Sequence, residues 1–157
     1  FIPRMQVNQF DYARYIRDLE KGHFRDKFNF GVCEEGGGKW LLEDFVQSPN
    51  ALYVGGMGSG KSVSCRFSVL TWLLSNSDKT VMFIIDTLKG AQDYKTLFHL
   101  PQVYDVVDSV DGVFRVIEMA YDEMLARNAL FRQHGVESVA AYEQKTGKKM
   151  SRIVTLF

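Results

Sequence analysis

The stretch ALYVGGMGSGKSVSCRFSVLTWLLS, residues 51–75, decides the fold of this chain. Its first four residues form an apolar run typical of a short strand, and a glycine-rich turn follows them. Gly55, Gly60, Lys61 and Ser62 then satisfy the pattern G-x-x-x-x-G-K-[ST], which opens a largely apolar segment of helical length. A strand, a glycine-rich loop and a helix in this order predict a phosphate-binding loop.

The residue types in this loop suit phosphate chemistry. Glycines let the backbone turn tightly enough to aim several N–H groups at one phosphate, and the following helix adds the positive end of its dipole. Lys61 would reach the β- and γ-phosphates of a nucleoside triphosphate, and the Ser62 hydroxyl would ligate Mg²⁺, so we assign catalytic roles to both. The alternative is a glycine-rich turn without a ligand, but the flanking segments favour nucleotide binding. The expected nucleotide-binding residues are Gly55, Gly56, Met57, Gly58, Ser59, Gly60, Lys61, Ser62 and Val63.

The composition indicates one folded domain, or a piece of one. Of the 157 residues 46% are apolar, so the chain can bury an ordinary core and extensive disorder is excluded. Nineteen basic and nineteen acidic residues cancel, which gives no overall electrostatic argument for nucleic acid, although a local patch or an oligomer pore could supply one. Cys33 and Cys65 fit no metal-binding spacing, and no apolar run is long enough to span a bilayer. Because the sequence begins at Phe1 without a methionine, we interpret it as a fragment.

The segments before the loop predict a helix and a hairpin. Residues 8–21 have helical periodicity, and Gly22 can end that helix. Lys27–Val32 alternates as a half-buried strand does, and Lys39–Leu42 can pair back with it across a glycine-rich turn at residues 34–38. The expected apolar face of the helix consists of Tyr12, Tyr15, Ile16 and Leu19.

The segment after the loop predicts a helix over Ser62–Ser75 and then an interior strand. Thr80–Ile85 is a continuous β-branched and aromatic run, as expected of a strand inside a parallel sheet. It ends at Asp86, and the carboxyl ends of such strands form the edge where ligands bind. Asp86 can therefore contact metal-bound water, or it can simply cap the loop that follows.

The remaining residues continue the alternation of helices and strands, which predicts an α/β fold with a mostly parallel sheet flanked by helices. In P-loop ATPases a later apolar strand ends in an acid that holds the Mg²⁺ water shell. Residues 152–157 have the pattern of that strand, so we expect its acid beyond Phe157. The other expected elements are a short helix at Tyr94–Leu100, a strand at Val103–Val107, a long helix from Ser109 to about Gln133 with Val113, Val116 or Ile117, Ala120 and Met124 inward, and a short helix at Ser138–Lys145.

Three segments occur in an order that resembles a known family. They are ALYVGGMGSGKSVS (51–64), FIID with Lys89 (83–89) and YDEMLARNALFRQHGVESVAAYE (121–143). Together they resemble the motor domain of the FtsK/SpoIIIE family of DNA translocases and their relatives in type IV and type VII secretion. The upstream segment FNFGVCEEGGGKWLLEDFVQSPNALYV (28–54) is also similar to the family's strand pair that leads into the loop, so the resemblance covers about residues 28–157.

The resemblance implies a RecA-like P-loop NTPase that works as a homo-hexameric ring, binds ATP and Mg²⁺, and moves a substrate through its central channel. It divides the chain into an N-terminal amphipathic helix and linker, residues 1–27, and a partial RecA-like ATPase domain, residues 28–157. Arg127, at the family's Glu-Met-x-x-Arg position, and Arg66, one turn into the loop helix, are candidates for nucleotide or interface contact. Ordinary helix-surface arginines are the alternative for both.

The function expected first is an ATP-hydrolysing motor subunit that moves DNA, in segregation, conjugation or mobile-element transfer. The second candidate is a secretion or coupling ATPase that delivers protein substrates to an envelope export machine. The third is a non-catalytic nucleotide-binding module that controls assembly. For the motor candidates we expect a cytoplasmic location at the inner face of the bacterial membrane, with a membrane-anchored partner or a membrane segment elsewhere in the protein.

Overall fold

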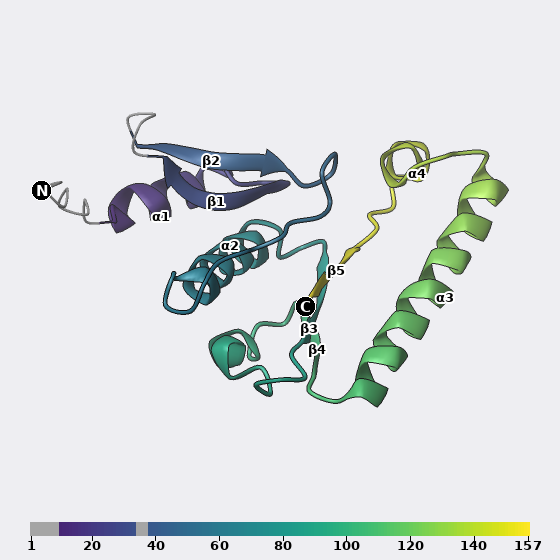
Figure 1. Cartoon of the computed structure of the whole chain (residues 1–157). Coiled ribbons are helices and arrows are strands. Elements are labelled where there is room, and N and C mark those ends of the chain that lie inside the picture. Colours follow the sequence, from purple (N-terminus) through teal and green to yellow (C-terminus); the bar gives the residue numbers. More distant parts are fainter. Residues whose placement is uncertain (1–9, 34–37) are drawn as a thin grey trace, which may run out of the picture.

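The chain forms a parallel sheet with a helix on each face and an antiparallel hairpin outside one of these helices (Figure 1). The computed structural model describes residues 10–33 and 38–157. The elements are α1 (Tyr12–Glu20), β1 (Lys27–Cys33), β2 (Lys39–Asp44), α2 (Lys61–Ser75), β3 (Thr80–Ile85), the 3₁₀ helix η1 (Gln92–Leu97), β4 (Val103–Val107), α3 (Val110–His134), α4 (Val139–Thr146) and β5 (Arg152–Leu156).

The central strand of the sheet is β3, which pairs in parallel with β4 on one side and β5 on the other. Its side chains alternate between the two faces. Met82 and Ile84 pack with α2, whereas Phe83 and Ile85 pack with Val116 of α3. The prediction of an interior parallel strand is confirmed, and so is the α/β class.

Helix α2 lies between the sheet and the hairpin, which explains why its apolar residues occupy several faces. Trp72 and Leu73 are completely buried. On the hairpin side, Phe28 belongs to the same core, and the ring of Phe45 meets that of Trp72 at 4.9 Å between centroids. The predicted hairpin is confirmed by antiparallel pairing from Lys27 with Asp44 to Cys33 with Lys39. The glycine turn at 34–37 and the helix start expected at residue 8 lie outside the described residues.

The caps of the last two helices follow the sequence closely. Ser109 accepts a hydrogen bond from the Gly112 N–H at 3.3 Å, and Ser138 accepts one from the Ala141 N–H at 3.2 Å. Both helices end at a left-handed glycine, Gly135 and Gly147. These local signals explain why the predicted boundaries of α3 and α4 are confirmed within one or two residues.

The predicted apolar face of α1 is partly wrong. Tyr12 is 72% exposed and Ile16 is also exposed, while Tyr15 is buried. The helix contacts α2 through the Tyr15 hydroxyl, which lies 3.0 Å from Thr71, and the Tyr15 ring stacks on Phe24. It contacts β2 through Asp18, which accepts a hydrogen bond from the Trp40 ring N–H at 2.6 Å.

The expected strand at Ala51–Val54 is not formed. A strand needs a neighbour for its backbone hydrogen bonds, and none of the described strands pairs with these residues. Leu52 and Val54 are 86% and 85% exposed, and an open groove of about 1130 Å³ separates this segment from β5.

Two helix predictions also need correction. The short helix expected at Tyr94–Leu100 is present as a 3₁₀ helix, and its bounds are shifted to Gln92–Leu97. On α3, Val116 is buried as expected while Ile117 and Met124 are exposed. The buried residues of α3 lie in its first turns, where it packs on β3 and β4, and its later turns stand farther from the sheet (Figure 1).

An ion-pair cluster joins distant segments at the end of the sheet where β3 and β5 begin. The Asp26 carboxylate pairs with Lys79, just before β3, at 2.7 Å and with Arg152, at the start of β5, at 2.5 Å. Its backbone N–H donates to the buried side chain of Asn76 at 3.1 Å. Asp26 has a left-handed backbone with φ of 59°, so this hub combines a special backbone conformation with two opposite charges.

Candidate functional site

The glycine-rich loop leads directly into the N-terminus of α2. Gly58 and Gly60 have φ of +76° and +84°, values that side chains with a Cβ adopt only with strain. Gly60 is the residue before the helix, and its carbonyl accepts from the Ser64 N–H at 2.9 Å. The N–H groups of the first turn, at Lys61, Ser62 and Val63, have no acceptor earlier in the helix and are available to a ligand at this end.

Gly55 allows a close approach of another kind, which a side chain there would permit only if the Ser59 hydroxyl turned away. A Cβ placed there would collide with the side chain of Ser59. The Ser59 N–H donates to the Gly56 carbonyl at 3.3 Å, which closes the turn inside the loop. The glycines thus permit a tightly folded backbone with open space beside it, as a phosphate cradle requires.

The Lys61 side chain reaches back across the loop. Its ammonium Nζ lies 3.4 Å from the carbonyl oxygen of Gly55. Lys61 is exposed and Ser62 is half-buried, so both side chains can reach a ligand. No acidic residue occurs between positions 51 and 64, which leaves the lysine and the helix dipole to favour an anion. The residues present fit a triphosphate.

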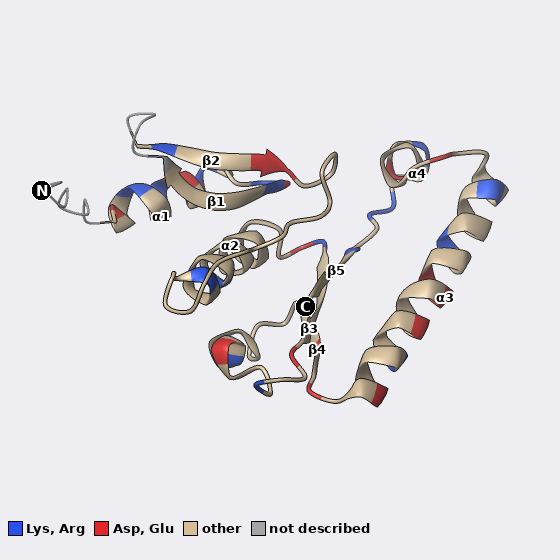
Figure 2. Ribbon diagram, in the orientation of Figure 1, with Lys and Arg blue, Asp and Glu red and all other residues tan. Residues whose placement is uncertain are grey.

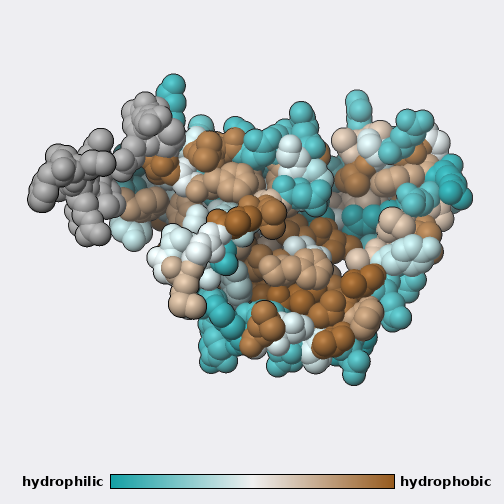
Figure 3. Space-filling view, in the orientation of Figure 1, coloured by the Kyte–Doolittle hydropathy of each residue, from teal (hydrophilic) through white to brown (hydrophobic). Residues whose placement is uncertain are grey.

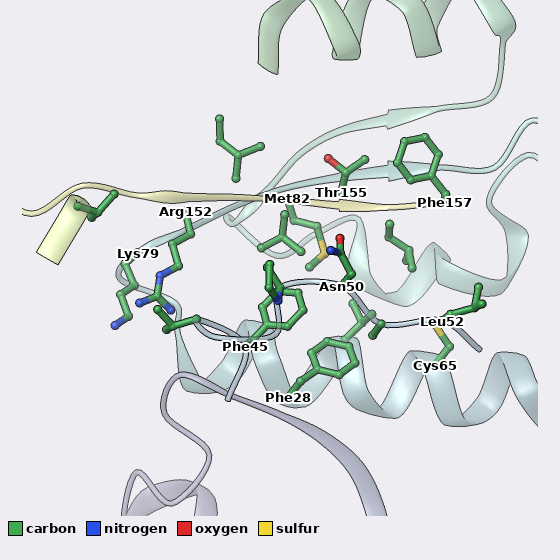
Figure 4. A pocket seen from close by; sticks show the side chains of 18 of the residues that line it. Phe28, Phe45, Asn50, Leu52, Cys65, Lys79, Met82, Arg152, Thr155 and Phe157 are labelled. Carbon is green, nitrogen blue, oxygen red and sulfur yellow. The ribbon is translucent and has the colours of Figure 1, made fainter. Parts of the chain in front are cut away.

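The groove beside the loop is lined on one side by the segment Asn50–Tyr53 and on the other by β5 and Phe157. Lys61 and Ser62 stand in its wall. Figure 4 shows Leu52 and Cys65 near one end, with Thr155 and Phe157 across from them and Lys79 and Arg152 at the far end. Apolar atoms surround a hollow at the centre of this face in Figure 3. The groove is therefore mostly apolar, with the cationic loop lysine at its edge.

Asp86 adopts the capping arrangement. Its carboxylate accepts from the N–H groups of Leu88 at 3.2 Å and Lys89 at 2.9 Å, and it does not line the groove. Lys89 lies at the surface, 3.5 Å from Asp93. Among the described residues, no cluster of three or more histidine, cysteine or acidic side chains could hold a metal ion.

The two candidate arginines are placed differently. Arg127 lines the groove and pairs with Glu123 at 2.7 Å within α3. Arg66, on the helix after the loop, does not line it. The structure thus brings Arg127 to the groove shared with Lys61 and Ser62, and leaves Arg66 and Asp86 outside it.

Sequence reasoning missed the contact at the base of the loop. The Tyr53 hydroxyl donates to Ser68 of α2 at 2.5 Å, and burial raises the pKa of Tyr53 above its usual value. Farther along, the Tyr94 hydroxyl lies 3.5 Å from the Cys65 sulfur, and burial raises the pKa of the Cys65 thiol. A tyrosine two residues before the first glycine carries no recognised signal, because its partner lies 15 residues away.

Both signs of charge occur on α1, β2, η1, α3 and α4, and no element of the view in Figure 2 carries a long run of one sign. None of the helices described here is both long and apolar enough to cross a membrane.

The sequence model of the FtsK/SpoIIIE family matches residues 17–157, which is most of the chain. This chain belongs to the FtsK/SpoIIIE family. The match extends upstream of the loop through the hairpin to the last residues of α1, and downstream through β5.

Individual relatives are distant and much longer. The chain is 29% identical over 137 residues to the DNA translocase FtsK of Caldanaerobacter subterraneus, covering 85% of this chain and 19% of that protein. It is 23% identical over 152 residues to the ESX-5 secretion system protein EccC5 of Mycobacterium marinum, covering 91% of this chain and 11% of that protein. It therefore spans less than a fifth of the length of these two relatives.

A solved structure, of the pCW3 conjugation coupling protein TcpA as a monomer with ATPgS, resembles the chain with a TM-score of 0.67. The identity is 24%, and the match covers 83% of this chain and 35% of that one. At this identity the likeness concerns the fold alone. It confirms the prediction of a RecA-like α/β fold.

Proposed function

We propose that this chain is part of an ATP-binding and ATP-hydrolysing motor subunit that moves DNA through a ring. The observation that carries the proposal is the loop at residues 55–62, which combines a lysine with the free N–H groups at the start of α2. This loop occurs in a chain of the FtsK/SpoIIIE family. Such a loop is built to hold the phosphates of a nucleotide.

The proposed roles follow from position. The N–H groups of residues 56–63, apart from that of Ser59, would hold the phosphates. Lys61 would exchange its contact with the Gly55 carbonyl for the β- and γ-phosphates, and the Ser62 hydroxyl would ligate Mg²⁺. Bound Mg²⁺ would neutralise charge that develops on the phosphate oxygens. Arg127 is favoured over Arg66 for a nucleotide or interface contact because it lines the groove.

One observation supports DNA as the substrate. Relatives that cover most of this chain are DNA translocases, among them the FtsK protein of Caldanaerobacter subterraneus. The relatives are also several times longer, so the ring, its hexameric state and any membrane anchoring at the cytoplasmic face are proposed for the whole protein.

Protein secretion is the second candidate function. The relatives EccC5 and, at 28% identity, EccC4 of Mycobacterium tuberculosis are secretion system proteins. A chain whose charges cancel has no overall field that would attract DNA, which agrees with a protein substrate.

Hydrolysis by the full-length protein is the first test. Lys61→Ala should abolish ATP hydrolysis, whereas Lys89→Ala, which removes an exposed lysine paired with Asp93, should leave the rate unchanged. A normal rate in Lys61→Ala would overturn the assignment. If the wild-type protein binds ATP and never hydrolyses it, the non-catalytic assembly module becomes the better description.

The salt dependence of DNA stimulation separates the two motor candidates. If the protein moves DNA, added duplex should raise the ATPase rate, and the stimulation should fall steeply between about 50 and 200 mM salt. If added DNA does not change the ATPase rate at low salt, the secretion candidate is favoured.

A further inference from the structure

Two buried hydroxyl groups on α2 make the same unusual arrangement. Ser68 and Thr71 are completely buried. Ser68 donates to the carbonyl of Ser64 at 3.1 Å, and Thr71 donates to that of Phe67 at 2.9 Å. Each hydroxyl has a single proton, so each must accept the hydrogen bond from the tyrosine that it meets.

The two tyrosines come from different parts of the chain. Tyr53, two residues before the first loop glycine, donates to Ser68 at 2.5 Å. Tyr15, on α1, lies 3.0 Å from Thr71. The helix after the loop is therefore held by two chains of hydrogen bonds, each from a tyrosine through a hydroxyl to a backbone carbonyl.

The chain through Tyr53 joins the two arms of the loop. Tyr53 belongs to the segment that enters the loop, and Ser64 belongs to the first turn of the helix that leaves it, because its N–H closes that turn on Gly60. Among the hydrogen bonds of the described residues, the other one that spans the loop is the 3.4 Å contact of Lys61 with Gly55, which a bound phosphate would replace.

The Tyr53 ring is itself supported by the hairpin. It packs at 5.8 Å from the ring of Phe30 on β1, which in turn packs against Phe28 in the main core. A hydrogen bond between two side chains anchored in this way fixes the spacing of the elements that carry them. None of the described strands pairs with residues 51–54, so the packing and the hydrogen bond of Tyr53 attach this segment to the core in place of a sheet.

We propose that Tyr53 is a positioning residue for nucleotide binding, acting through Ser68 to hold the two arms of the phosphate loop at the spacing that a triphosphate requires. This inference rests on the proposed function. A loop that is already ordered loses less conformational entropy when the phosphates bind, so its affinity is higher. The Tyr15 chain attaches α1 to the helix one turn farther from the loop and has no such effect.

The test is the dissociation constant of ATP, measured by calorimetry on the full-length protein. Tyr53→Phe removes one hydroxyl and should weaken ATP binding by up to about five-fold, the limit reached when ATP binding must restore the order that the whole hydrogen bond supplied. Tyr15→Phe is the matched control, since it removes the corresponding hydroxyl from the other chain. It should lower thermal stability to a similar extent and leave the dissociation constant unchanged.

A third variant examines the route through Ser68. Ser68→Ala should weaken ATP binding as much as Tyr53→Phe, and the double variant should be no weaker than either, because both changes break one chain. Additive losses would overturn the inference, as would equal losses in Tyr15→Phe and Tyr53→Phe. If Tyr53→Phe binds ATP as tightly as the wild-type protein does, the inference about Tyr53 is wrong and the proposed function stands. If the wild-type protein does not bind ATP, both the proposed function and the inference are wrong.

Discussion

The two ends of the parallel sheet are built in opposite ways. Where β3 and β5 begin, Asp26, Lys79 and Arg152 form a closed cluster that ties three distant segments together. At the other end, the loop at residues 55–62 is exposed, and few hydrogen bonds from its own side chains hold it. Binding loops generally belong to the less stable parts of a structure, because their polar groups must stay free for the ligand. The comparison predicts that changes at the first end affect folding and changes at the second affect binding.

The largest loss of stability is expected for Asp26→Ala. It removes the carboxylate that pairs with Lys79 and Arg152. It also places alanine, which adopts a positive φ less readily than aspartate, in a left-handed backbone conformation. The cluster is partly exposed, so we expect about 2 kcal/mol of lost unfolding free energy, less than for a fully buried pair. Urea unfolding measures it.

Asp26→Asn is the control for the backbone part of this effect. Asparagine tolerates the left-handed conformation, so the variant should lose only the charge contribution, about half as much. Equal stability of Asp26→Ala and the wild type would contradict the comparison.

Acid should weaken the same end of the sheet. Burial by itself would raise the pKa of Asp26, but the hydrogen bond from Lys79 and the charges of Arg152 and Lys79 outweigh it and hold the pKa below the usual 3.8. The hydrogen bond from Arg25, with its charge, lowers the pKa of Asp78 to about 2. Both carboxylates therefore stabilise the fold fully above about pH 4, and this contribution falls as the pH drops toward 2.

Unfolding free energies measured from pH 5 to pH 2 test this sign. The wild-type curve should fall over that interval, and the double variant Asp26→Asn with Asp78→Asn should give a shallower one. Parallel curves would mean that these carboxylates do not carry the acid sensitivity.

At the loop end, Gly60→Ala is expected to have a smaller effect on stability. Alanine at a φ of +84° costs about 1 kcal/mol of unfolding free energy. Gly147→Ala, at a φ of +70° after α4, should cost as much while leaving ATP binding intact. Both variants introduce similar backbone strain, but only Gly60→Ala changes the phosphate loop, so only this variant should lose ATP binding. A loss of ATP binding in both variants would contradict this prediction.

The smallest effect on stability is expected for Lys61→Ala. The side chain is exposed and makes one long hydrogen bond, so the unfolding free energy should change by less than about 0.5 kcal/mol. If urea unfolding shows that Lys61→Ala loses about 2 kcal/mol of unfolding free energy, the loop end contributes as much to stability as the ion-pair cluster at the other end of the sheet, and the comparison is wrong.

The same contrast explains what the sequence could predict. The caps Ser109 and Ser138 and the run at Thr80–Ile85 act through neighbours in the chain, so these elements were predicted correctly. The pattern of glycines and lysine at residues 55–62 likewise indicated the site locally, before any partner was known.

Long-range contacts were not predictable. Arg152 and Asp26 form an ion pair although they are 126 residues apart in the sequence. No sequence pattern around Asp26 predicts its positive φ. The run at 51–54 has strand composition, but none of the described strands pairs with it, and pairing depends on residues elsewhere in the chain. The hydrogen bond from Tyr53 to Ser68 is also a contact of this kind, because it depends on how α2 packs against the segment that enters the loop.

Direct titration of ATP into the full-length protein, wild type and Lys61→Ala, tests the central claim most directly. A charge-assisted contact from the lysine to the phosphates predicts at least ten-fold weaker binding in Lys61→Ala, with an unchanged unfolding free energy. Equal dissociation constants for the two proteins would show that the loop does not bind the phosphates, and would contradict the proposed nucleotide site.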